Sequence, residues 1–331
     1  LCSTPQYIFI LNERSSIPFK KGSAKIYFVS LLCKYFRIIM HKAGFVNIIG
    51  YPNVGKSTLM NAMVGQKLSI ITSKAQTTRH RIMGIVNGDD FQIVYSDTPG
   101  IVKDPSYKMH QYMNHFVDTA LKDADIILLM TEPDFQFSDK EIIEKFNSSG
   151  RKVIVVINKI DLSNQEEIMK QITSWQELLP KSEVIPVSAL NNFNLESLFD
   201  VIIENLPEHD AFYPKDELTD KSMRFFVSEI IREKILLNYK KEIPYSVEVA
   251  VDQYKEEEKI IRISALIYVA RESQKAIILG HQGQAIKRTA TAARKDLEEF
   301  VGKKVFLETT VKVSKDWRDN ENILKNFGYS Q

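Results

Sequence analysis

The stretch Gly50-Tyr51-Pro52-Asn53-Val54-Gly55-Lys56-Ser57 has the pattern G-x-x-x-x-G-K-S, which is typical of a phosphate-binding P-loop. The apolar residues 45–49 before it predict a buried strand, and residues 58–64 after it have helical character. This context lets backbone N–H groups turn towards phosphate oxygens at a helix N-terminus. We expect Lys56 to reach the β- and γ-phosphates and the Ser57 hydroxyl to ligate Mg²⁺. The flanking strand and helix argue against the alternative, a glycine turn with an incidental Lys-Ser pair.

Length and composition allow two domains. The chain has 331 residues, 44% of them hydrophobic, which supports packed cores. Its formal net charge is only +2, so an argument for nucleic-acid binding must rest on local clusters. The two cysteines, Cys2 and Cys33, give no indication of a disulfide scaffold or a cysteine-based metal site. No apolar run approaches the roughly 20 residues of a membrane span.

Residues 1–39 differ in character from the rest. The short apolar run 26–33 resembles a weak signal segment, but Lys34 follows at once and there is no small-residue cleavage site. Met40 stands just before the first strand. We therefore favour the interpretation that the protein begins at Met40 and that residues 1–39 are an extension outside the fold. An organelle-targeting presequence and a surface appendage are the alternatives.

Strands and helices alternate after the P-loop, which predicts an α/β domain with a mostly parallel sheet and helices on both faces. A polar loop, 66–81, leads to two strands joined by the hairpin turn Asn87-Gly88-Asp89-Asp90. Ser138 and Glu141 have capping-box spacing at the start of one helix. The expected strands are 82–86, 91–95, 126–130, 153–157 and 184–187, and the expected helices are 138–146, 164–178 and 194–205.

The pattern changes around Pro207 and Pro214, where we place a linker, 206–221, between domains at 40–205 and 222–331. The second domain is expected to have the order α-β-β-α-α-β, a small α+β sheet with helices on one side. Its expected helices are 222–239, 274–279 and a long one ending at Phe300, and its expected strands are 247–251, 260–269 and 305–313.

Two further motifs define what the first domain binds. In Asp97-Thr98-Pro99-Gly100 the carboxylate can hold Mg²⁺ through a water, and the Gly100 N–H can sense a γ-phosphate. In Asn158-Lys159-Ile160-Asp161 the carboxylate can accept both donors of guanine, N1–H and the 2-amino group. Adenine lacks both donors and would leave Asp161 unpaired. The Lys159 stem can lie on the base, and the N–H of Ala189 in Ser188-Ala189-Leu190 can donate to guanine O6.

These motifs resemble those of translation-factor-like GTPases. With residues 76–81, Gln-Thr-Thr-Arg-His-Arg, the similarity is closest to the Era family of bacterial ribosome-assembly GTPases, over about residues 42–325. The resemblance implies that GTP is hydrolysed to GDP and phosphate, and that Thr78, rather than Thr77, completes the Mg²⁺ shell. The loop around Thr78 would be the first switch, and 97–115 the second.

The expected site residues fall into three groups. The catalytic residues are Lys56, Thr78, Gly100 and Asn53, and the Mg²⁺ ligands are Ser57, Thr78 and Asp97. The nucleotide contacts are Gly50, Tyr51, Pro52, Asn53, Val54, Gly55, Lys56, Ser57, Thr58, Asp97, Thr98, Pro99, Gly100, Asn158, Lys159, Asp161, Ser188, Ala189 and Leu190.

Ile101 follows D-T-P-G where Ras-type enzymes carry a glutamine that orients the attacking water. Isoleucine has no donor or acceptor, so we expect slow intrinsic hydrolysis. The resemblance implies a remedy, because in some relatives the P-loop asparagine, here Asn53, ligates a potassium ion beside the phosphates. The alternative is that Asn53 only forms a turn after Pro52.

Gly280-His281-Gln282-Gly283 is a G-x-x-G loop between two predicted helices, and this arrangement resembles a type II KH domain. Paired glycines let a nucleic-acid backbone approach closely, and we expect RNA contacts from these four residues and from Lys287 and Arg288. Residues 281–318 hold nine basic residues (Lys287, Arg288, Arg294, Lys295, Lys303, Lys304, Lys312, Lys315, Arg318) against five acidic ones (Asp296, Glu298, Glu299, Glu308, Asp316). An ordinary solvated helix face is the alternative.

The resemblance implies a GTP-controlled RNA-binding switch in assembly of the small ribosomal subunit, with 16S rRNA bound near its 3′ end. We expect a cytoplasmic protein without an obligate oligomer, and a peripheral contact with the inner face of the cell membrane stays open. The alternative is a membrane- or cell-cycle-linked signalling GTPase whose C-terminal domain binds protein. A third role, partner of an RNA-modifying enzyme, is disfavoured by the KH pattern.

Overall fold

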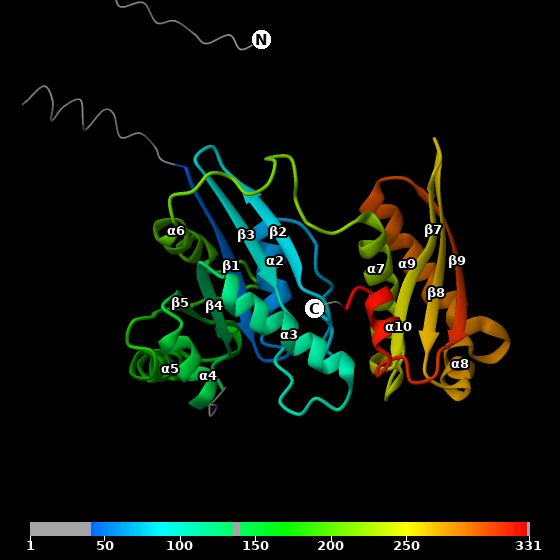
Figure 1. The fold of residues 1–331 in the computed structure, drawn as a ribbon, viewed down its shortest axis with the longest axis horizontal. Helices are drawn as coiled ribbons and strands as arrows, with labels where there is room; N and C mark the ends of the chain where they lie inside the picture. Colours follow the sequence, from blue (N-terminus) through cyan, green and yellow to red (C-terminus); the bar gives the residue numbers. More distant parts are fainter. Residues whose placement is uncertain (1–40, 135–139, 330–331) are drawn as a thin grey trace, which may run out of the picture. The chain divides into compact units, whose positions relative to one another are not determined.

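The computed structural model describes residues 41–134 and 140–329, and its strands form two separate sheets (Figure 1). The expectations for residues 1–39 and for the capping box at Ser138 therefore lie outside the described residues. No helix in the described ranges is long and apolar enough to cross a membrane.

The first sheet has six strands in the order β2-β3-β1-β4-β5-β6. All neighbours pair in parallel except β2 and β3, which form the expected hairpin. This confirms the mostly parallel α/β sheet predicted from the alternating pattern. The strands are β1 (Lys42–Gly50), β2 (Ile82–Asn87), β3 (Phe91–Asp97), β4 (Ile126–Thr131), β5 (Lys152–Ile157) and β6 (Glu183–Pro186).

Helices cover both faces of this sheet because successive residues of a buried strand point to opposite sides. Ile48 of β1 belongs to an apolar core with Leu59 and Leu198, whereas its neighbour Ile49 packs with Val117 on the other face. The helices on the Ile48 face are α2 (Lys56–Val64) and α6 (Leu195–Asn205), and those on the Ile49 face are α3 (Lys108–Asp123), α4 (Lys140–Ser148) and α5 (Gln165–Leu178).

The second sheet has three strands, β7 (Val247–Glu256), β8 (Ile260–Val269) and β9 (Lys304–Val313), with β7 antiparallel and β9 parallel to β8. Alternate residues of β8 are buried, so one face of the sheet is packed. Its core joins the strands to α7 (Met223–Asn238), α8 (Glu272–Leu279) and α9 (Gln284–Val301). The order α-β-β-α-α-β is the one predicted for a type II KH domain.

Residues 206–221 lie along the first sheet instead of crossing open solvent. The Ala43 N–H donates to the Pro207 carbonyl, 3.1 Å, and the Ile85 N–H to the Leu218 carbonyl, 2.9 Å. The Gln92 side chain accepts from the backbone of Phe212, 2.7 Å. The segment expected to be a linker is therefore tied to β1, β2 and β3 along its length.

Candidate nucleotide-binding site

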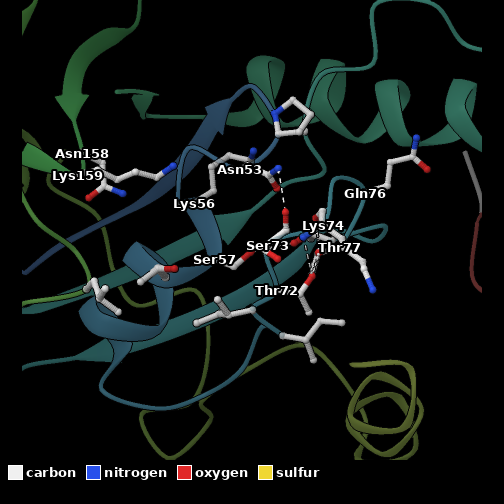
Figure 2. Close-up of a pocket in the computed structure, with 18 of the residues that line it drawn as sticks. Asn53, Lys56, Ser57, Thr72, Ser73, Lys74, Gln76, Thr77, Asn158 and Lys159 are labelled. Carbon is white, nitrogen blue, oxygen red and sulfur yellow. Dashed lines mark hydrogen bonds between the residues drawn. The ribbon is translucent and has the colours of Figure 1, made fainter. Parts of the chain in front are cut away.

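A cavity of about 510 Å³ opens where β1 and β5 end in loops (Figure 2), which is where open parallel sheets bind ligands. Several predicted residues, among them Gly50, Asp97 and Ala189, lie outside its lining. Its walls also include residues 70–74, 76 and 77, most of which sequence reasoning did not assign. The lining residues are Pro52, Asn53, Gly55, Lys56, Ser57, Thr58, Ile70, Ile71, Thr72, Ser73, Lys74, Gln76, Thr77, Thr78, Gly100, Asn158, Lys159, Asp161, Leu162, Ser188 and Leu190.

The P-loop conformation is held by close packing at Gly55 and by hydrogen bonds of Lys56. Gly55 has φ +96°, and a Cβ there would lie 2.2 Å from Asn158 Nδ2, so a side chain is excluded. Lys56 begins α2, and its buried Nζ donates to the carbonyls of Gly50, 3.1 Å, and Tyr51, 2.8 Å. Burial lowers the pKa of Lys56 to about 8, against the opposing charge of Asp97. The loop thus presents a cation beside backbone groups suited to phosphate.

Three oxygen-bearing side chains converge at the predicted Mg²⁺ site. The Ser57 hydroxyl donates to Asp97 Oδ2 at 2.6 Å and lies 2.9 Å from Thr78 Oγ1. Thr78 Oγ1 also donates to Asp97 Oδ2, at 3.3 Å. Asp97 is fully buried, its Oδ1 has no hydrogen-bond partner, and burial raises its pKa. A buried carboxylate oxygen with no partner, beside two hydroxyls, fits a hard divalent cation.

Thr77, the less favoured candidate for the metal, points elsewhere. Its Oγ1 lies 2.6 Å from Thr72 Oγ1 and donates to the Lys74 carbonyl, also at 2.6 Å. The Thr77 side chain therefore makes hydrogen bonds within its own loop, whereas the Thr78 side chain contacts Ser57 and Asp97.

The four residues expected to recognise the base lie together. Asn158 Nδ2 donates to the Val54 carbonyl, 2.8 Å, which ties this loop to the P-loop. Its Oδ1 accepts from the Ala189 N–H, 2.9 Å, so the N–H expected at guanine O6 is bonded to Asn158 here. Asp161 Oδ1 accepts from the Ser188 hydroxyl, 2.5 Å, and the carboxylate lines the cavity. Lys159 pairs with Glu132 at 2.6 Å.

Two leucines flank the base pocket. Leu162 and Leu190 both line the cavity and are each 77% exposed. Apolar side chains in these positions could contact the faces of a bound aromatic ring. Leu190 was expected from the sequence, whereas Leu162 was not, although it directly follows Asp161 in the chain.

Asn53 and Ile101 differ in what they can offer the phosphates. Asn53 has a left-handed backbone, φ 66°, and its Nδ2 donates to the Ser73 carbonyl at 3.3 Å, as Figure 2 shows. Ile101 packs against the apolar cores on both faces of the first sheet. Its side chain therefore serves packing and has no polar group for a water.

The G-x-x-G loop is a short 3-10 turn, His281–Gly283, between α8 and α9. Gly280 has φ 69°, and a Cβ there would lie 2.6 Å from Ala285 Cβ, so only glycine fits. His281, Gln282, Lys287 and Arg288 are all exposed. Beside the loop, a groove of about 470 Å³ on α9 is lined by Gln284, Lys287, Arg288, Thr291, Ala292 and Lys295.

Comparisons with known proteins agree with this architecture. Residues 45–159 match the family described as 50S ribosome-binding GTPase, and residues 242–318 match a KH domain. The chain is 43% identical to the GTPase Era of Clostridium kluyveri over 293 residues, covering 88% of this chain and 100% of the relative. It is 46% identical to the GTPase Era of Syntrophus aciditrophicus over 297 residues, covering 88% and 97%.

Two solved structures resemble the whole described fold. One is Era in complex with MgGDPNP and nucleotides 1506–1542 of 16S ribosomal RNA, with 37% identity and a TM-score of 0.84 over 88% of this chain and 100% of that one. The other, an Aquifex aeolicus Era variant bound to GDP and AlF4⁻, gives the same values. Fold and site together define a P-loop GTPase that carries a KH domain. More narrowly, the chain belongs to the GTPase Era family.

Proposed function

We propose that this GTPase is a GTP-controlled RNA-binding switch in assembly of the small ribosomal subunit, and that its KH domain binds 16S rRNA near the 3′ end. One observation carries the proposal: the chain holds both a guanine- and phosphate-binding constellation and a G-x-x-G loop flanked by exposed Lys287 and Arg288. Support comes from the Era structure described with nucleotides 1506–1542 of 16S ribosomal RNA. The proposed domains are 40–205 and 222–331, joined by 206–221.

The proposed chemistry uses the convergent groups at the P-loop. Ser57, Thr78 and Asp97 would hold Mg²⁺, which supplies positive charge beside the β- and γ-phosphates when bound. Lys56 adds a second positive charge, and the N–H of Gly100, which lines the cavity, would sense the γ-phosphate. Ile101 cannot orient a water, so intrinsic hydrolysis is slow. Asp161 selects guanine by accepting its two adjacent donors.

We propose that a potassium ion assists hydrolysis, because Ile101 stands where Ras-type enzymes carry a glutamine. The Asn53 Nδ2 donates to the Ser73 carbonyl at 3.3 Å, and both residues line the cavity, so the Asn53 amide oxygen and this loop carbonyl are the proposed ligands. Oxygen atoms of this kind suit a monovalent cation. The ion would add positive charge where the transition state gathers negative charge.

The proposal places the protein in the cytoplasm without an obligate oligomer, with a peripheral contact at the inner face of the cell membrane. The resemblance to the family supports this placement, and the exposed basic residues of α9 offer a surface for anionic partners. The competing function, a signalling GTPase whose second domain binds protein, predicts that these basic residues are dispensable for RNA.

The test is RNA crosslinking of the whole protein with GTP and with GDP, followed by sequencing of the bound RNA. Replacing His281 and Gln282 by aspartate puts negative charge against phosphates without altering the glycines. RNA crosslinking should fall at least tenfold while GTP binding survives, because the loop belongs to another domain. The control variant is Lys170→Asp/Lys181→Asp on the first domain. Undiminished crosslinking in the loop variant would favour the protein-binding alternative.

A further inference from the structure

Thr78 is held near the candidate metal site by a bond to the second domain. Its Oγ1 lies 2.9 Å from Ser57 Oγ. The carbonyl of the preceding residue, Thr77, accepts a 2.5 Å hydrogen bond from Nη2 of Arg232 on α7. Because this bond is made to the main chain, it fixes the backbone immediately before Thr78.

Arg79, on the other side of Thr78, is anchored in the same domain. Its guanidinium is fully buried. Nη1 donates to the Val247 carbonyl at 2.6 Å and to Glu248 Oε2 at 3.0 Å, and Nη2 donates to the Pro244 carbonyl at 3.1 Å. The residues on either side of Thr78 are therefore both hydrogen-bonded to the second domain.

The anchors form one buried cluster with balanced charge. Arg232 pairs with Glu229 at 2.5 Å, and Arg79 pairs with Glu248. The Tyr329 O–H donates to Glu248 Oε2 at 2.8 Å. Burial opposes ionisation of Glu248, but Arg79 and Arg232 hold its pKa below the usual value. Removing one member would leave a buried charge unpaired, which is strongly unfavourable, so the docked arrangement is well defined.

We propose that Arg232, acting through Thr77, and Arg79, acting through Glu248, are positioning residues for Thr78. The inference rests on the proposed function, which makes Thr78 a ligand of Mg²⁺ in the GTP state. No residue of the second domain lines the nucleotide cavity within the described ranges. The KH domain nevertheless contributes to GTP affinity, because docking orders the Thr78 loop before the nucleotide arrives.

The test replaces Arg232 by methionine, which removes both the donor to Thr77 and the ion-pair partner of Glu229. Affinity for a non-hydrolysable GTP analogue with Mg²⁺ should fall about tenfold, as expected for loss of a charge-assisted hydrogen bond. The Mg²⁺ concentration for half-maximal analogue binding should rise. GDP affinity should stay unchanged, because the first switch contacts the metal only when the γ-phosphate is present. The measurement is a titration of fluorescent nucleotides at several Mg²⁺ concentrations.

Three further variants separate positioning from general damage. Arg232→Lys keeps a positively charged N–H donor, so its affinity for the analogue should lie between those of the unmodified protein and Arg232→Met. Tyr329→Phe removes only the O–H donor to Glu248 and should give a smaller loss in the same direction. Arg224→Met is the matched control, since Arg224 lies on the same helix and donates instead to the carbonyls of Val251 and Asp252.

Two results would overturn the inference: an unchanged affinity for the analogue in Arg232→Met, or equal losses of affinity for the analogue and for GDP. A different result bears on the proposed function. If the unmodified protein binds the analogue with no dependence on Mg²⁺, Thr78 is not a metal ligand, and both the function and the inference fall.

Discussion

At the scale of single residues, Asp161 is the residue that we propose selects the guanine base. Its carboxylate lines the cavity and is oriented by the Ser188 hydroxyl at 2.5 Å. Asp161→Asn should weaken GTP binding by roughly 3–5 kcal/mol, because two hydrogen bonds to an ionised group are lost. The variant should instead favour xanthine nucleotide, whose 2-oxo group accepts where guanine donates. Nucleotide titrations with GTP and with xanthosine triphosphate measure the change.

Asp134→Asn is a suitable control for this experiment, since Asp134 is exposed and lies outside the cavity lining. It should leave both affinities as they are. An Asp161→Asn protein that binds GTP like the unmodified protein would remove the physical basis for guanine selection.

Asn53 carries the second prediction at this scale. If it holds potassium with the Ser73 carbonyl, hydrolysis should be faster in KCl than in NaCl at equal ionic strength. Asn53→Ala should abolish that difference. GTP affinity should change little, because the ion acts mainly in the transition state. Single-turnover hydrolysis in matched salts is the measurement, and equal rates for the unmodified protein would leave backbone groups or bound RNA as the missing catalyst.

Sequence motifs predicted most of the cavity because their spacing along the chain fixes which side chains meet. Ser57 and Asp161 line the cavity, and Asp97 accepts a hydrogen bond from the Ser57 hydroxyl. The family resemblance favoured Thr78 over Thr77 for the metal, and in the structure the Thr78 hydroxyl is the one that lies near Ser57 and Asp97. Arg232 has no motif, because its bond to Thr77 joins positions 155 residues apart and depends on how α7 docks.

At the scale of elements, apolar runs predicted the strands well, because a strand buried on both faces needs an unbroken hydrophobic sequence. Two helices were missed. The N-cap of α3, Tyr107, makes no side-chain cap bond, and no acid lies in its first turn, so the usual start pattern is absent. The other, α10 (Glu321–Asn326), has six residues, too few for a helical period to show.

Helix α9 carries the prediction for RNA affinity. Lys287 and Arg288 line its groove and are exposed. On single-stranded RNA, each phosphate contact contributes roughly 0.7 to the slope of log affinity against log salt concentration. If both residues contact phosphates, replacing both by alanine should therefore make this slope shallower by about 1.4. Binding to a single-stranded RNA at several KCl concentrations gives this slope.

The control variant for α9 is Lys170→Ala/Lys181→Ala, which removes the same charge from the first domain. Its affinity and salt slope should match those of the unmodified protein. If the α9 variant keeps its salt slope, Lys287 and Arg288 make no phosphate contacts, and the groove on α9 is an ordinary solvated helix face.

At the scale of the whole molecule, the C-terminal residues join both parts of the fold. Trp317, Leu324 and Tyr329 form an apolar cluster with Met109 and Met113 of α3. Arg318 contributes its carbonyl to the Met109 N–H at 3.0 Å. The segment after β9 is thus packed against the helix that follows D-T-P-G, a contact that no local pattern in the sequence indicates.

This packing predicts that the two parts unfold together. Trp175 and Trp317 are both buried, one in the core of the first sheet and the other in the C-terminal cluster. Trp317→Phe and Trp175→Phe leave one tryptophan each as a fluorescent reporter. Denaturant transitions of the two variants should then share one shape and a closely similar midpoint.

Arg79→Met should separate the two transitions, because it leaves Glu248 buried without its ion-pair partner at a cost of about 3–5 kcal/mol and removes the Arg79 bonds to the carbonyls of Val247 and Pro244. The matched control is Arg81→Met, which breaks an ion pair with Asp123 inside the first domain. That variant should unfold at lower denaturant concentration but still in one transition. Two resolved transitions in the unmodified protein, or a single one in Arg79→Met, would show that the buried cluster does not couple the domains.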